Sequence, residues 1–163
     1  MTSSALRTAL SSATISTFEE LGLLFPADGA APARRGEPLV GGVRVDFDGP
    51  WRGTVVVRAT AGVLATAAAN MLGRAEPPAE PLRRDALGEL ANVLCGNLLP
   101  AVAGRAAVFE LGAPRWLSAG DAVGRDVTGD EAPAAALALE LEEGRVEVTL
   151  HVTHAPVERA EAP

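Results

Sequence analysis

Four residues of the segment RRDALGELANVLCGNLLP, residues 83–100, could do chemistry together without a nucleophile. Asp85, Glu89, Asn92 and Gly96 follow one another at steps of four, three and four. On a helix, at roughly 100° per residue, this spacing places them in a stripe about 60° wide. The stripe offers carboxylates, a carboxamide and a position without a side chain, but no basic residue. Another protein's backbone could approach such a surface closely.

A solvated helix face is the simpler interpretation of this stripe. Solvated faces usually mix Glu with Lys or Arg at i+4, because such pairs are weakly stabilising. Asn and Gly are also poor helix formers, and Gly costs about 1 kcal/mol relative to Ala. Leucines at 87, 90, 94 and 98 form a good packing side for the same helix. Something other than helix stability therefore favours Asn92 and Gly96, although spacing alone leaves both interpretations open.

Three segments predict helices. Apolar residues at near-helical spacing predict one over residues 5–24, ended by Pro26. An Ala-rich stretch over residues 61–73 predicts the second, with Gly73 as its stop. The stripe lies on the third, which we expect over residues 82–99 with Pro100 near its end.

Alternating residues predict the strands of a sheet. We expect a hairpin over residues 43–60, a short strand ended by Pro114, and a long hairpin over residues 134–152. The order is a helix, two strands, two helices and three strands. It predicts an α+β domain in which helices pack on a largely antiparallel sheet.

Length and charge limit the possible functions. With 163 residues, 48% of them hydrophobic, the chain can form one domain, which we expect over 1–155 with a short tail at 156–163. Its 14 basic residues are outnumbered by 21 scattered acidic ones, so nucleic acid is an unfavourable partner. Every basic residue is Arg, which excludes Schiff-base chemistry on Lys and a phosphate-loop Lys.

Cysteine content and hydropathy predict a cytoplasmic protein. Cys95 is the only cysteine, so it cannot form an internal disulfide. No cleavable apolar leader is present at the start, and the apolar stretches are too short or too interrupted to span a membrane. Cys95 adjoins the apolar side of its helix, so we expect a packing residue rather than a nucleophile.

The remaining polar and aromatic candidates favour structural roles. On a strand, the spacing of His151 and His154 places them on opposite faces, which predicts exposed strand-end histidines and no metal site. Asp46 and Asp48 precede a tight turn, where Asp is favoured for local hydrogen bonding. Tryptophans at 51 and 116 could anchor an interface or cover the sheet.

The stripe resembles the signature of the CheC, CheX and FliY group of chemotaxis phosphatases. That signature has an acidic residue or Ser, then Glu, then Asn, and a Pro roughly twenty positions later. Here these are Asp85, Glu89, Asn92 and, with a spacing about one residue shorter, Pro114. CGN at 95–97, the segment 46–60 and the segment 109–120 also resemble the CheX branch, so the similarity covers roughly residues 5–155. The CheC branch carries the motif twice and this chain carries it once, which indicates CheX.

The resemblance implies a phosphatase that hydrolyses the aspartyl phosphate of a CheY-like receiver domain. An acyl phosphate is already activated, so its hydrolysis needs positioning more than a protein nucleophile. Asn92 would position the attacking water, and Glu89 would pair with a lysine of the receiver. Asp85, Gly88 and Gly96 would contact the receiver, with the glycines admitting its loops.

The same resemblance has consequences for cofactors and assembly. Mg²⁺ would be bound by the receiver, and the chain would need no cofactor of its own. A homodimer through a sheet edge is expected. An alternative stays open, in which the surface binds a phosphorylated receiver without hydrolysis, as an adaptor, because docking and catalysis would share Glu89 and Asn92.

Overall fold

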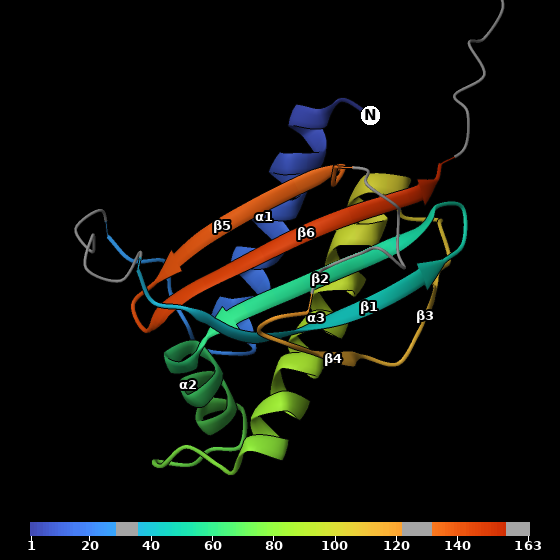
Figure 1. Ribbon diagram of the computed structural model, residues 1–163. Helices are drawn as coiled ribbons and strands as arrows, with labels where there is room; N and C mark the ends of the chain where they lie inside the picture. The colour runs from blue at the N-terminus through green and yellow to red at the C-terminus, as the bar shows by residue number, and fades with distance from the viewer. Residues whose placement is uncertain (29–35, 122–131, 156–163) are drawn as a thin grey trace, which may run out of the picture.

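The computed structural model describes residues 1–28, 36–121 and 132–155, so the expected tail at 156–163 lies outside the described residues. Three helices cover one face of an antiparallel sheet (Figure 1). This arrangement confirms the α+β class. The elements are α1 (Ser3–Glu20), β1 (Leu39–Asp48), β2 (Arg52–Thr60), α2 (Ala61–Met71), α3 (Glu80–Ala103), β3 (Glu110–Leu111), β4 (Arg115–Ser118), β5 (Ala135–Leu141) and β6 (Gly144–His154).

Alternation along the strands determines which face packs on the helices. In the order β3-β1-β2-β6-β5, with β4 also paired to β1, neighbouring strands are antiparallel. Val43, Val45 and Phe47 of β1 are buried in the core, while the intervening Arg44 and Asp46 point to the outer face. Both predicted hairpins are present.

Helix α3 is longer than predicted because Pro100 does not end it. The helix begins at Glu80 and runs to Ala103, where Gly104 adopts a φ of 96°. Pro100 lies in the last turn, where few further backbone bonds depend on its missing N–H. Because Pro100 has no N–H, it cannot donate the usual helical hydrogen bond to the carbonyl of Gly96.

Two other predicted boundaries are wrong. Helix α1 ends at Glu20 rather than near 24, because Leu23 turns the chain with a φ of 51°. Leu24 is still completely buried. Pro114 does not simply end one strand: β3 and β4 lie on either side of it, in a gap where no ladder N–H is needed.

Helix α3 is the central helix of the core. Its leucines at 87, 90, 94 and 98 are buried, and so is Cys95. Burial raises the pKa of the Cys95 thiol to about 12, which fits a packing residue. By length and composition alone α3 could cross a membrane, but 56% of its most apolar window is buried in the protein, as in a core helix.

The outer edge of β5 is only partly free. Leu141 forms an isolated bridge with Pro26, and the carbonyl of Glu140 accepts a hydrogen bond from the N–H of Ala27. Within the described residues, positions 135–139 have no strand partner on that side. On this side of the sheet, the edge available for the predicted dimer is therefore the first part of β5.

Candidate functional site

The predicted stripe lies on the open side of α3. Asp85 and Glu89 are exposed and Asn92 is half-buried. All three line a pocket of about 320 Å³. The other lining residues are Val43, Arg84, Gly88, Pro114 and Trp116.

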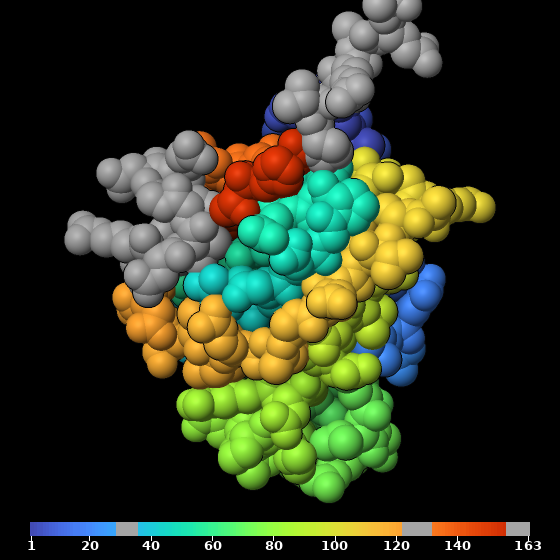
Figure 2. Space-filling view, turned by 90° about the vertical axis from the view of Figure 1, so that its right-hand side faces the viewer, coloured from blue at the N-terminus to red at the C-terminus, as the bar shows by residue number. Residues whose placement is uncertain are grey.

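A segment that follows α3 in sequence forms the facing wall of this pocket. Figure 2 shows it as a gold to orange band between the blue-green of β1 and the lime green of α3. We call residues 112–116 the wall segment. A Cβ built on Gly88 would lie 3.2 Å from Pro114 Cβ, so glycine lets Pro114 pack directly on the helix. Gly88 is buried, and its lack of a side chain serves this internal contact.

Arg84 and Trp116 form one rim of the pocket. The Arg84 guanidinium lies 4.7 Å from the centroid of the Trp116 ring, and Arg84 Nε donates to Glu80 at 3.2 Å. Sequence reasoning missed Arg84 and left Trp116 undecided. No local spacing relates them, because the pairing of β4 with β1 brings them together.

The charges of the pocket are unbalanced. Among the described residues, neither Asp85 nor Glu89 forms an ion pair or side-chain hydrogen bond. Arg84, the basic residue of the lining, already contacts Glu80 and Trp116. The pocket is therefore suited to a positively charged group from outside the chain.

No described residue holds the carboxamide of Asn92 through a hydrogen bond. Its Oδ1 is enclosed and accepts no hydrogen bond from the described residues, an arrangement that typically costs about 1–3 kcal/mol. The other two asparagines are anchored: Asn70 Nδ2 donates to the carbonyl of Gly22 at 2.8 Å, and Asn97 Nδ2 donates to Thr17 Oγ1 at 3.1 Å. Turning the Asn92 amide toward a ligand in the pocket would thus break no hydrogen bond to the described residues.

The remaining residues of the resemblance lie outside the pocket lining. Gly96 is exposed, and a Cβ built on it would meet no atom within 4 Å. Asn97 bonds to Thr17 and so faces α1. The structure therefore brings Asp85, Glu89 and Asn92 together with Gly88 and Pro114, and leaves Gly96 one turn beyond.

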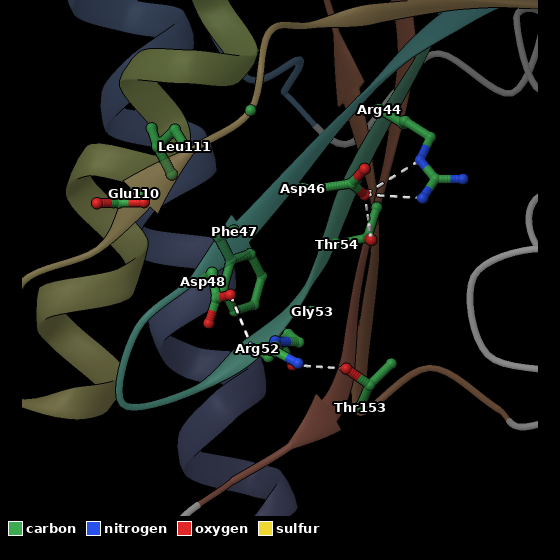
Figure 3. A pocket seen from close by; sticks show the side chains of 11 residues that line it. Arg44, Asp46, Phe47, Asp48, Arg52, Gly53, Thr54, Glu110, Leu111 and Thr153 are labelled. Atoms are coloured by element: carbon green, nitrogen blue, oxygen red, sulfur yellow. Dashed lines mark hydrogen bonds and ion pairs between the residues drawn. The ribbon is translucent and has the colours of Figure 1, made fainter.

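A second polar cluster surrounds Asp46 on the outer face of the sheet (Figure 3). Its Oδ1 accepts hydrogen bonds from Arg44 at 3.1 and 2.8 Å and from Thr54 Oγ1 at 2.6 Å. Its Oδ2 pairs with Arg115 at 2.9 Å. Burial raises the pKa of Asp46, but the hydrogen bonds from Thr54 and Arg44 and the charges of Arg44 and Arg115 outweigh this effect and lower it. The partners of Asp46 are thus strand residues rather than the turn expected from the sequence.

The prediction of two exposed histidines is wrong for His151. His151 lies within β6 opposite Thr54 of β2 and is buried. Its Nε2 lies 3.1 Å from Thr149 Oγ1, and burial together with the charge of Arg44 lowers its pKa. His154 is exposed. The parts of the chain that the structure describes contain no group of three or more His, Cys, Asp or Glu able to hold a metal.

Known structures share this fold. CheX of Desulfovibrio desulfuricans is 18% identical, with a TM-score of 0.68 over 90% of this chain and 98% of that one. CheX of Vibrio vulnificus is 15% identical, with a TM-score of 0.66 over 93% and 99%. CheX of Borrelia burgdorferi, solved in complex with CheY, BeF3 and Mg²⁺, is 15% identical, with a TM-score of 0.63 over 90% and 97%.

Sequence comparison gives the family. No curated protein matches the chain significantly. Residues 42–133, more than half of the chain, match the family described as chemotaxis phosphatase CheX. This match includes the whole of α3 and the wall segment that closes the pocket against it. The chain therefore belongs to the CheX family, within the CheC, CheX and FliY group of chemotaxis proteins.

Proposed function

We propose that this chain hydrolyses the aspartyl phosphate of a CheY-like receiver domain at the open face of α3. One observation carries the proposal: the carboxamide of Asn92 and the carboxylate of Glu89, both without a partner among the described residues, lie one helical turn apart and line the same pocket. Such an amide and carboxylate are suited to a ligand that supplies a hydrogen-bond partner for Asn92 and a positive charge for Glu89.

The chemistry needs few protein groups. A water molecule attacks phosphorus in line, the bond between phosphorus and the receiver's aspartate oxygen breaks, and carboxylate and inorganic phosphate are released. Asn92 can accept a hydrogen bond from this water through Oδ1 and donate another from Nδ2. Such positioning supplies much of the rate when the leaving group is already good.

Glu89 and Asp85 would dock the receiver. Both are exposed and unpaired among the described residues, so a lysine of the receiver can reach Glu89 without displacing an internal partner. Gly96 would let a receiver loop lie against the helix. We expect Mg²⁺ to be bound by the receiver, where it would neutralise phosphoryl charge; the CheX of Borrelia burgdorferi was solved with CheY, BeF3 and Mg²⁺.

Two copies of the chain are expected to pair through the free part of the β5 edge, positions 135–139. Strand edges with unpaired backbone groups favour such pairing. The pocket on α3 is formed by other elements and would stay open in this dimer.

An adaptor that binds the phosphorylated receiver without hydrolysing it is the second candidate. Phosphate release from acetyl-phosphate-charged receivers, measured with and without the protein, separates the two functions. The proposal predicts faster release, which a BeF3-activated receiver inhibits by competition. Binding without acceleration would indicate the adaptor, and a lack of both would contradict each function.

A further inference from the structure

We propose that Asp46 is a positioning residue for the docking pocket: from the outer face of the sheet it holds the wall segment that carries Pro114 and Trp116. The effect on docking rests on the proposed function, whereas the effect on the wall segment does not. Asp46 itself is absent from the pocket lining, so it would act through other residues.

Asp46 holds the wall segment on both sides of Pro114. The N–H of Gly112 donates to the Asp46 carbonyl oxygen at 2.8 Å. Arg115 Nη2 donates to Asp46 Oδ2 at 2.9 Å. Pro114, between these two attachments, has no N–H with which to anchor itself. One residue of β1 thereby fixes the short connection that packs on Gly88.

The charge of Asp46 also permits the pairing of β4 with β1. Arg44 and Arg115 are directly opposite each other in the register of these strands, and both contact Asp46. Like charges in opposite positions are destabilising unless a counter-charge lies between them. Asp46 supplies that counter-charge, and β4 has only four residues with which to resist the repulsion. Trp116 is one of those four.

Exposure limits the size of the effect. The side chains of Asp46 and Arg115 are 42% and 61% exposed, and exposed ion pairs are weak. We therefore expect a looser wall rather than an unfolded protein, with a change in docking of about two- to fivefold. Asn92 belongs to α3, which Asp46 does not contact through its side chain. KM should thus rise while kcat stays nearly constant.

The chain offers a matched control on the same strand. Asp48 is two residues from Asp46 and also pairs with an arginine, Arg52, at 2.9 Å. Among the described residues, its carboxylate forms no hydrogen bond or ion pair with the wall segment. Asp46→Asn and Asp48→Asn therefore remove the same charge, and only the first weakens a side-chain contact with the wall segment, the one to Arg115.

The experiment compares these two variants with the wild type by two readouts. The first is the indole N–H resonance of Trp116, one of only two tryptophans, assigned with a Trp51→Phe variant. The second is the KM and kcat for phosphate release from a charged receiver. Asp46→Asn should shift or broaden the Trp116 signal and raise KM, whereas Asp48→Asn should do neither.

Arg115→Gln is a third variant, which tests the same contact if Asp46→Asn folds poorly. Arg115→Gln leaves Asp46 bonded to Arg44 and Thr54 and removes its side-chain contact with the wall segment. It should reproduce both changes to a smaller extent, because it also removes the repulsion between Arg44 and Arg115. An unchanged Trp116 signal in Asp46→Asn and Arg115→Gln would overturn the inference, as would an equal change in Asp48→Asn. A loss of kcat alone would indicate less folded protein instead. If the wild type released no phosphate, the proposed function would fail while the Trp116 signal still tested the wall.

Discussion

The open face of α3 and the outer face of the sheet around Asp46 are both polar, but they differ in whether their polar side chains have partners within the protein. Asp46 has three side-chain partners within hydrogen-bond distance. Glu89 has none among the described residues, and the Asn92 amide oxygen accepts no bond from them. Polar groups that have hydrogen-bond partners stabilise a fold, whereas buried polar groups without partners destabilise it. This difference is why we propose a structural role for the Asp46 cluster and a recognition role for the open face of α3.

Of the substitutions considered, Asn92→Ala should cause the largest change, a loss of kcat. Removing one positioning group typically costs about 10²-fold in kcat, and binding of a BeF3-activated receiver should hardly change. Steady-state phosphate release and calorimetric titration would measure the two quantities. Asn97→Ala, an amide on the same helix that bonds to α1, is the control and should retain activity. Equal losses of binding and rate would assign Asn92 to docking.

Glu89→Gln should weaken receiver binding by roughly tenfold, since it removes one interfacial charge pair. Added salt should weaken the wild type in the same direction, because screening acts on the same pair. Glu19→Gln on α1 provides a charge-matched control. Salt-independent binding would contradict the pairing of Glu89 with a lysine.

The two glycines of α3 should respond differently to alanine. At Gly96 the new Cβ meets no atom, so helix propensity should raise the free energy of unfolding by about 0.5–1 kcal/mol. At Gly88 the new Cβ lies 3.2 Å from Pro114, and this contact should offset the gain. Denaturant unfolding measures both values. Equal stabilisation at the two positions would show that Pro114 does not pack on α3.

Breaking the predicted dimer should halve the molecular mass in solution. It should leave the activity of the α3 face unchanged. The Glu140 carbonyl faces the outer edge of β5, so by alternation the N–H of Ala138 faces it too. Ala138→Pro removes that donor, and Ala138→Ser keeps it as the control. Light scattering at tens of micromolar should give a dimer mass for the control and a monomer mass for the proline variant. A wild-type monomer would exclude the predicted dimer.

Local patterns predicted much of the fold and the acidic stripe. Alternation over β1, β5 and β6 was informative because one face of these strands is buried more than the other, and β2 was predicted from its run of valines. The spacing of Glu89 and Asn92 alone placed them on one side of α3. The rest of the site depends on contacts between distant residues. Asp46 and Arg115 are 69 positions apart, and no periodicity relates Arg84 to Trp116. His151 was misjudged because alternation does not show how enclosed an outer face is.

The side-chain amide resonances of Asn92 test the recognition role of α3 most directly. The sequence contains three asparagines and no glutamine, so a ¹⁵N spectrum should show only three side-chain amide pairs. Asn70 and Asn97 are bonded internally and serve as references in the same sample. On addition of a BeF3-activated receiver with Mg²⁺, the Asn92 pair should shift while the two reference pairs stay in place. An unmoved Asn92 pair at receiver saturation would contradict docking at this face.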